Sequence, residues 1–208
     1  MIHAVIFDID DTLLHSMSAD DVLYRQAIRD TVGKVRFRAQ LADYQHVSDF
    51  GILREVLNDN GIAATDDTTA AIQRRFLDSL AEYVETNGPF REIDGARKLI
   101  DRLRASNDHA VALATGCWRE SAQLKLHTAG FDVADLPLAT ADDAVPRVDI
   151  MQTALRALPT GLASITYFGD GVWDQRACAS LGWRFRPVGP GLNGIGNYHG
   201  EYIELQTQ

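Results

Sequence analysis

The chain has 208 residues, of which 46% are hydrophobic, 24% charged and 8% aromatic. That length allows one ordinary domain, or one domain with a modest insertion, and either can bury a sizeable core. The 29 acidic residues outnumber the 20 basic ones, which gives a formal net charge of −9. This charge argues against a general nucleic-acid binder and against docking on an anionic membrane, because both need a basic face.

Targeting and redox features of the sequence are sparse. The chain reaches Asp8 before a signal-peptide hydrophobic segment forms, and no apolar run is long enough to span a bilayer. Cys117 and Cys178 lie far apart without CxxC spacing, so neither a disulfide framework nor a zinc site is indicated. We therefore expect a cytoplasmic protein in a reducing environment.

The first predicted element is a short buried strand over residues 2–8, which runs apolar and then stops at acids. Residues 16–88 show helical patterns only, beginning with Ser18 and Asp21 as a capping box. Gly88 and Pro89 mark the end of this stretch. We expect a helical cap over residues 16–88, inserted into a core formed by residues 1–15 and 89–208.

From residue 95 onward, helical and strand patterns alternate. Helical stripes lie within 96–103, 122–129 and 151–158, and strands are expected at 110–114, 136–139, 165–168 and 183–188. The strands are continuously apolar, which is typical of a parallel sheet covered on both faces. The sequence therefore predicts an α/β fold, a Rossmann-like doubly wound parallel sheet core with an inserted α-helical cap. Such a cap would sit over the carboxyl ends of the strands, where ligands bind.

Three predicted strands end in residues suited to phosphoryl chemistry. Asp8 and Asp10 follow the first strand, and Asp170 and Asp174 follow the strand at 165–168. Carboxylates so close together repel one another unless a cation lies between them, and Mg²⁺ prefers oxygen ligands of this kind. Thr115 and Gly116, after the strand at 110–114, offer a hydroxyl and an open backbone N–H to an anion.

These residues resemble the motifs of the haloacid dehalogenase-like hydrolase superfamily, and the resemblance covers essentially the whole chain. The family's D-x-D-x-T, its strand-terminal Thr or Ser, and its G-D-x-x-x-D are matched by Asp8, Asp10 and Thr12, by Thr115, and by Gly169, Asp170 and Asp174. A narrower resemblance, to the phosphoglycolate-phosphatase-like branch with a helical type-1 cap, lies in residues 48–57, 114–116, 124–126 and 129–130.

The resemblance implies a mechanism and a set of site residues. Asp8 would be the nucleophile that forms an aspartyl-phosphate, and Asp10 would be the general acid and base. Mg²⁺ would be held by Asp8, the backbone carbonyl of Asp10 and Asp170, with Asp174 at or just behind the ligands. Thr115 and Gly116 would bind the phosphoryl oxygens.

The sequence departs from the family at the third motif, a basic residue that is usually Lys. Arg147 stands at the expected position, in Pro146–Ile150, whereas Lys125 lies earlier on a predicted helix. Either could place a cation beside Asp8 and the phosphate. We favour Arg147, because it opens a helix that follows a strand, and keep Lys125 as the alternative.

Several other residues have simpler interpretations. Asp11 is expected to cap or to face solvent, Cys117 to pack rather than act as a nucleophile, and Trp118 to pack against the cap. His46 is more typical of a surface histidine than of a substrate contact. Residues 189–194 match GxGxxG, but Pro190 removes a needed donor, so we interpret them as a loop.

The sequence thus predicts a Mg²⁺-dependent phosphatase that hydrolyses a small phosphorylated metabolite, phosphoglycolate-like or another phosphomonoester, without a nucleic-acid or membrane partner. One alternative is a haloacid dehalogenase of the same fold, which would attack carbon with Asp8 and need no metal. Others are a phospho-accepting receiver module and a regulatory protein that has lost catalysis. The substrate and the oligomeric state are left open.

Overall fold

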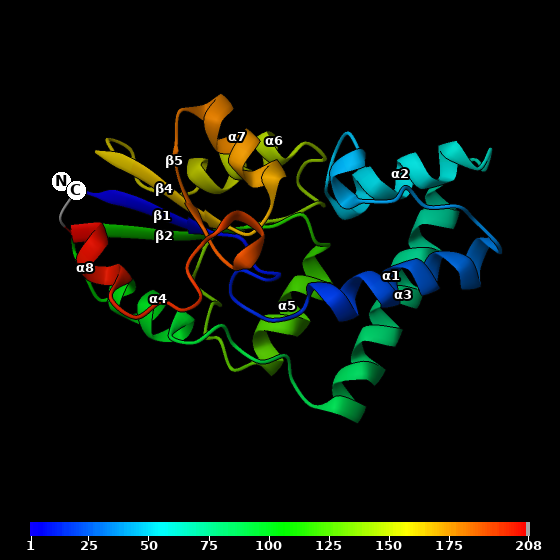
Figure 1. The fold of residues 1–208 in the computed structure, drawn as a ribbon, viewed down its shortest axis with the longest axis horizontal. Helices are drawn as coiled ribbons and strands as arrows, with labels where there is room; N and C mark the ends of the chain where they lie inside the picture. The colour runs from blue at the N-terminus through cyan, green and yellow to red at the C-terminus, as the bar shows by residue number, and fades with distance from the viewer. Residues whose placement is uncertain (207–208) are drawn as a thin grey trace.

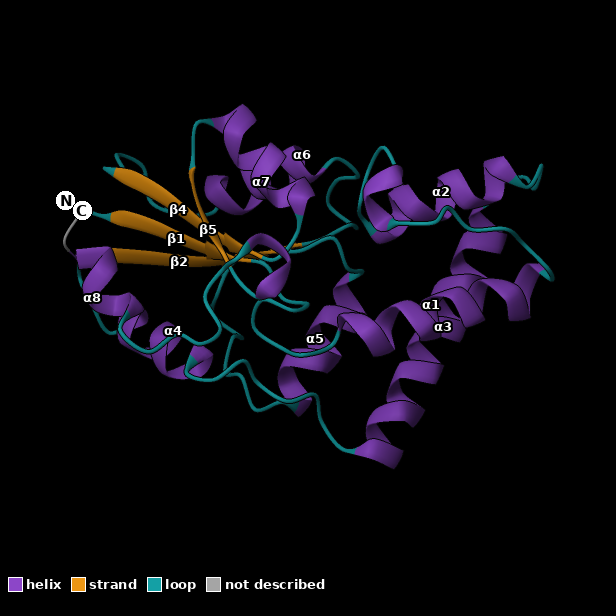
Figure 2. Ribbon diagram, in the orientation of Figure 1, coloured by secondary structure: helices purple, strands orange, loops and turns teal. Residues whose placement is uncertain are grey.

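The computed structural model describes residues 1–206, and their central feature is a five-stranded parallel sheet in the order β3-β2-β1-β4-β5 (Figures 1 and 2). The strands are β1 (His3–Phe7), β2 (His109–Ala114), β3 (Leu138–Ala139), β4 (Ser164–Gly169) and β5 (Arg184–Pro187). Phe7 of β1 pairs with Leu113 on one side and Phe168 on the other. The three central strands therefore end level with one another.

Helices cover both faces of the sheet (Figure 2). One face carries α6 (Arg147–Arg156) and α7 (Val172–Leu181), and the other carries α4 (Ala96–Arg104), α5 (Arg119–Thr128) and the C-terminal α8 (Glu201–Gln206). Alternate residues of β1 supply the two cores: Ala4 and Ile6 belong to the α6–α7 side, whereas Val5 and Phe7 belong to the other. This is the predicted α/β, Rossmann-like architecture.

The segment between β1 and α4 is helical, as the sequence predicts. It contains α1 (Met17–Val32), a short 3₁₀ helix (Leu41–Asp43), α2 (Asp49–Asp59) and α3 (Asp66–Asn87), and α1 packs along α3. These helices lie beyond the carboxyl ends of the strands, opposite the end where the two termini meet (Figure 1). The division at residues 16 and 88 into cap and core domains remains a prediction.

The predicted start of α1 is wrong by two residues. The helix begins at Met17 with Ser16 at the N-cap position, so Ser18 lies inside the first turn and caps nothing. The reason is tertiary, because the Ser16 hydroxyl donates to the carboxylate of Asp10 instead of capping the helix. Asp11 takes over the capping, as its Oδ1 accepts from the backbone N–H groups of Ser16 and Met17 at 3.2 and 3.3 Å.

Two smaller expectations concern the C-terminal region and membranes. Residues 189–194 form a loop with a short 3₁₀ helix at Pro190–Leu192, so the GxGxxG match there opens no dinucleotide-binding helix. Within residues 1–206, each helix is too short or too polar to cross a bilayer.

Candidate active site

The level ends of the central strands bring the predicted motif residues together. Asp8 directly follows β1, and its backbone N–H donates to the carbonyl of Phe168 in β4 at 2.9 Å. Thr115 directly follows β2, and Asp170 directly follows β4. Three segments that are far apart in sequence therefore meet at one edge of the sheet.

Asp8, Asp170 and Asp174 form the acidic centre of this edge. One carboxylate oxygen from each lies within 4.8 Å of the others. Asp8 is 2% exposed and Asp174 is fully buried. Gly169 permits the approach of Asp174, because a Cβ at that position would lie 2.7 Å from Asp174 Oδ2. The glycine of the G-D-x-x-x-D motif thus leaves the space that the final acid of the motif occupies.

Crowding and burial change the acidity of this cluster. Burial raises the pKa of Asp170 to about 9, and the nearby carboxylates of Asp8 and Asp174 add to the effect. Burial also raises the pKa of Asp8 to about 7, against the opposing charge of Arg147. In addition, Asp170 Oδ1 is buried without a hydrogen-bond partner. An orphaned oxygen among mutually repelling carboxylates fits a divalent cation with oxygen ligands.

Arg147 is the cation of this cluster. It begins α6, and its Nη1 lies 3.3 Å from Asp8 Oδ1 while its Nε lies 3.3 Å from Asp174 Oδ1. Its Nη2 donates to the carbonyl of Val47 in the helical segment at 3.1 Å. Gly116 makes room for it, because a Cβ there would lie 2.8 Å from Arg147 Nη2 and 2.9 Å from the oxygen of Val47.

Asp10 and Lys125 form a second, separate charged group. Lys125 Nζ lies 2.7 and 2.8 Å from the two carboxylate oxygens of Asp10 and 2.6 Å from Asp20 Oδ1. Cys117 donates its thiol to Asp10 Oδ2 at 2.6 Å, and Ser16 donates its hydroxyl to Oδ1. Burial opposes ionisation, but Lys125 and these donors lower the pKa of Asp10. Its side chain is therefore an ionised carboxylate.

The structure separates the two candidate cations of the sequence. Arg147 contacts Asp8 and Asp174, whereas Lys125 is fully buried and contacts Asp10 and Asp20. The sequence analysis missed Asp20. A signal for it exists, because Asp20 shares one helical stripe with the buried residues Tyr24, Ala27 and Ile28 of α1. An acid on an apolar face points to a buried partner.

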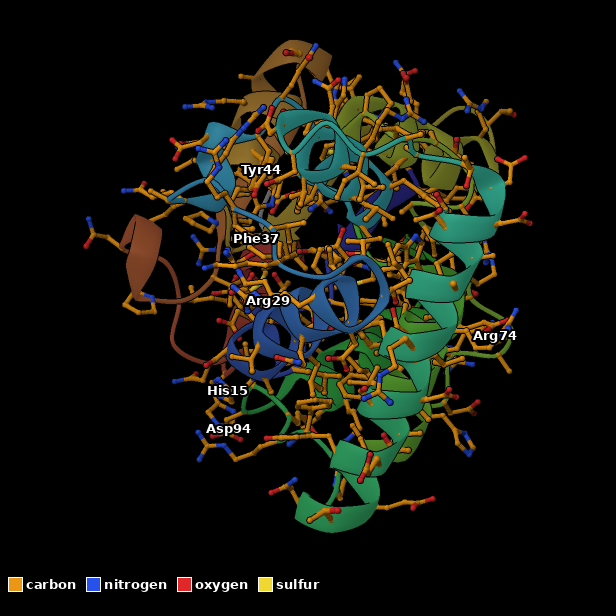
Figure 3. The ribbon with its side chains drawn as sticks, turned by 90° about the vertical axis from the view of Figure 1, so that its right-hand side faces the viewer. His15, Arg29, Phe37, Tyr44, Arg74 and Asp94 are labelled. Carbon is orange, nitrogen blue, oxygen red and sulfur yellow. The ribbon has the colours of Figure 1, made fainter. Side chains whose placement is uncertain are left out.

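A small cavity of about 50 Å³ lies between the strand ends and the helical segment. The strand ends contribute Asp8 and Thr115 to its lining, and the start of α6 contributes Arg147. The helical segment contributes charged and apolar side chains. Phe37, one of the apolar ones, lies between α1 and α2 in the view onto this segment (Figure 3). The cavity is therefore closed on one side by the helices that follow β1.

Aromatic packing and backbone contacts hold the helical segment against the strand ends. As predicted, Trp118 packs against this segment, with ring centroids 5.4 Å from Tyr24, 5.6 Å from Phe50 and 5.7 Å from Phe76. The carboxylate of Asp49 accepts from the backbone N–H of Trp118 at 2.7 Å. Cys117 is buried and its pKa is raised well above the ordinary value, so it is not a thiolate nucleophile.

Comparisons with known proteins agree with this fold. The model of the haloacid dehalogenase-like hydrolase family matches residues 2–182. No curated protein matches the sequence. Among solved structures, a hydrolase from Pseudomonas syringae is similar with a TM-score of 0.71 at 18% identity, over 88% of this chain and 83% of that one.

Two further solved structures show the same fold. A beta-phosphoglucomutase from Clostridium difficile has a TM-score of 0.71 at 14% identity over 100% of both chains. A predicted phosphoglycolate phosphatase from Haemophilus somnus has a TM-score of 0.65 at 16% identity, over 100% of this chain and 98% of that one. The family model covers most of the sequence, so the chain belongs to the haloacid dehalogenase-like hydrolase family.

Proposed function

We propose that this haloacid dehalogenase-like hydrolase is a Mg²⁺-dependent phosphatase that hydrolyses a small phosphomonoester, phosphoglycolate-like or another, through an aspartyl-phosphate. The observation that carries the proposal is the juxtaposition of Asp8 with a cation, Arg147, and with two further acids, Asp170 and Asp174. A nucleophilic carboxylate, a cation for phosphoryl oxygens and a set of oxygen ligands are the groups that phosphoryl transfer needs.

In the proposed reaction, a carboxylate oxygen of Asp8 forms a bond to phosphorus while the bond to the leaving-group oxygen breaks. Asp10 gives a proton to that oxygen and later takes one from the water that hydrolyses the aspartyl-phosphate, which releases inorganic phosphate and restores Asp8. Asp8, the backbone carbonyl of Asp10, Asp170 and Asp174 would hold Mg²⁺. When bound, the ion would neutralise charge on the transferring group.

The surroundings of Asp10 favour the second half of this cycle. Its carboxylate accepts from Lys125, Cys117 and Ser16 and is ionised, which is the form that takes a proton from water. For the first half, Asp10 must carry a proton, and we expect it to gain that proton on turnover of the preceding intermediate. Asp10 also lines the cavity, within reach of a ligand.

Phosphate binding is proposed for Thr115, Gly116 and Arg147. All three line the cavity, and Arg147 contacts Asp8, whose carboxylate would attack phosphorus. Arg147 therefore fills the basic position of the family better than Lys125, whose ammonium group is saturated by Asp10 and Asp20. A planar guanidinium suits this task, because it can donate to two phosphoryl oxygens at once.

The cluster of Asp8, Asp170 and Asp174 supports a phosphatase over a haloacid dehalogenase, because attack on carbon needs neither a metal nor additional carboxylates. Release of chloride from small haloacids in the presence of a chelator would support the dehalogenase instead.

The proposal is tested by hydrolysis of p-nitrophenyl phosphate. We expect activity with Mg²⁺, loss of activity with a chelator, and loss of at least about 10³-fold in Asp8→Asn, because the amide is not a nucleophile. Asp94→Asn is the matched control, since Asp94 is an acid 76% exposed on its side chain and paired with His199 away from the cavity. Full activity of Asp8→Asn would show that the mechanism is wrong.

A further inference from the structure

The helical segment contributes several charged groups to the lining of the cavity. Asp20, Asp21 and Arg25 of α1 and Asp49 of α2 all line the cavity. In the proposed phosphatase the phosphoryl group lies beside Asp8 and Arg147, so the helical segment is the part of the lining that faces the leaving group. The leaving group is the part of the substrate that differs from one phosphomonoester to another.

Arg25 is already engaged within this wall. Its Nε lies 2.8 Å from both carboxylate oxygens of Asp21, one turn earlier on α1. Its guanidinium also lies over the ring of Phe37, 4.7 Å from the centroid. The charge of Arg25 is therefore matched by Asp21 before a substrate enters.

Lys125 adds no free positive charge to the cavity. It is fully buried behind Asp10, and its ammonium group contacts the carboxylates of Asp10 and Asp20. An ammonium group has three N–H donors, and both oxygens of Asp10 and one of Asp20 lie within hydrogen-bond distance. A ligand would have to displace one of these acids to reach it.

Carboxyl groups therefore outnumber cations around the leaving group. Asp10, Asp20, Asp21 and Asp49 stand against Arg25 and Lys125, and burial raises the pKa of Asp49 well above its ordinary value. When Asp49 and Asp10 carry protons, Asp20 and Asp21 still pair with Lys125 and Arg25, so neither cation is free for a substrate carboxylate. Among residues 1–206, the cations that line the cavity are Arg25 and Arg147, and Arg147 is held by Asp8 and Asp174.

We propose that the substrate is a phosphomonoester with a small, uncharged or cationic leaving group, and that the Asp21–Arg25 pair and Asp20 exclude a leaving group that carries a carboxylate. The inference rests on the proposed phosphatase function and narrows it. A carboxylate would lose its water in this cavity and find no free cation there, whereas a hydroxyl or ammonium group can donate to the acids.

The size of the cavity sets the size of the leaving group. A water-sized group needs about 10–15 Å³ of such volume. The small volume of the cavity, about 50 Å³, favours a short leaving group over a nucleotide or a sugar, unless the helical segment moves away.

The test uses three substrates with the same short skeleton and different charge. They are 2-hydroxyethyl phosphate, 2-aminoethyl phosphate and carboxymethyl phosphate (phosphoglycolate), each assayed with Mg²⁺ for kcat/KM. We expect carboxymethyl phosphate to fall at least about tenfold below 2-hydroxyethyl phosphate, and 2-aminoethyl phosphate to equal or exceed it. Equal or better kcat/KM for carboxymethyl phosphate would overturn the inference.

A variant tests the residues named. Asp21→Asn removes the partner of Arg25, and we expect the ratio of kcat/KM for carboxymethyl to 2-hydroxyethyl phosphate to rise at least about fivefold. Asp21 is 34% exposed on its side chain, so we expect the variant to fold. The matched control is Asp30→Asn, which removes the same charge from α1 at a site paired with Arg75 outside the cavity. This variant should leave the ratio unchanged.

The outcomes separate this inference from the proposed function. Hydrolysis of p-nitrophenyl phosphate together with a preference for carboxymethyl phosphate would overturn only the inference. If the kcat/KM ratio is unchanged in Asp21→Asn, or rises equally in Asp30→Asn, the Asp21–Arg25 pair does not exclude the carboxylate. Absence of Mg²⁺-dependent hydrolysis of p-nitrophenyl phosphate and of all three esters would overturn the phosphatase function itself.

Discussion

Asp8 and Asp10 lie two residues apart, yet each is held by a different cation. Asp8 lies beside Arg147, and Asp10 lies beside Lys125. The division follows from their environments, because Asp8 shares its surroundings with Asp174 while Asp10 is enclosed by Ser16 and Cys117. The pKa values of two carboxylates in one short motif are thus shifted in opposite directions, that of Asp8 upward and that of Asp10 downward.

At the scale of single residues, we expect Arg147→Ala to lower turnover far more than Lys125→Ala. The first variant removes the cation beside Asp8, which stabilises charge on the transferring group and is worth about 10²–10³ in kcat by analogy with other charge-stabilising groups. The second leaves Asp8 and Arg147 in place and removes one of the groups that keep Asp10 ionised, whose carboxylate still accepts from Cys117 and Ser16. The comparison is made by kcat for p-nitrophenyl phosphate, at a temperature where circular dichroism shows both variants folded. The reverse ranking would give the basic position to Lys125.

At the scale of elements, the start of α1 is tied to α5 by buried charge. Lys125 of α5 bonds Asp20 of α1, and Ser16, which precedes α1, bonds Asp10 after β1. A buried ion pair contributes little net stability, but breaking it leaves a desolvated charge without a partner. The contact therefore specifies where α1 docks more than it stabilises the fold.

We expect Lys125→Met to lower the free energy of unfolding by about 3–5 kcal/mol, because it leaves Asp10 and Asp20 buried without their cation. Asp20→Asn in the same chain removes one of those charges, so the double variant should be less destabilised than the sum of the single variants by about 1–3 kcal/mol. Urea unfolding of the four proteins gives the cycle. Additive losses would mean that the two side chains do not interact.

At the scale of the whole molecule, part of the acidic surplus lies where the helical segment meets the strand ends. Seven carboxyl groups surround this junction: Asp8, Asp10, Asp20, Asp21, Asp49, Asp170 and Asp174. Their nearby cations are Arg25, Lys125 and Arg147. A divalent ion and an anionic phosphoryl group would complete this junction, so metal, substrate and the position of the helical segment are coupled through charge.

This coupling predicts the pH dependence of stability without metal. The folded-state pKa of Asp8, about 7, and that of Asp170, about 9, are raised above the ordinary 3.8, so the folded protein binds more protons than the unfolded chain between these values. Their contribution to stability is fully present below about pH 4 and is lost as the pH rises toward 7 and 9. In a chelator, the midpoint of thermal unfolding should therefore fall from pH 6 to pH 9.

Two controls accompany this measurement. Mg²⁺ should restore the midpoint at pH 9, because it binds the folded carboxylates. Asp170→Asn should reduce both the fall with pH in chelator and the gain with Mg²⁺. A midpoint that rises with pH in chelator would contradict the assignment of the shifted groups.

Much of the fold and most of the motif residues of the candidate site are legible in the sequence. The apolar runs at 4–7, 110–114 and 165–168 are strands, and each is followed within two residues by a polar residue of the candidate site. The sequence predicts these strands because burial on both faces leaves a local, continuous apolar pattern. It predicts the site residues because parallel strands place their carboxyl ends together. The strand at 136–139 is shorter than predicted and spans only Leu138–Ala139, at the edge of the sheet.

What the sequence by itself determined is therefore the alternation of elements, the helical segment after β1 and the acids at the strand ends. Only the tertiary structure decided which cation each acid meets, that Ser16 serves Asp10 rather than a helix cap, and that Asp20 and Asp21 face the cavity. The physical reason is the distance along the chain over which each interaction acts. Hydrophobic periodicity and turn chemistry act between near neighbours in the sequence. Lys125 and Asp10 are 115 residues apart and meet only through strand register and helix packing.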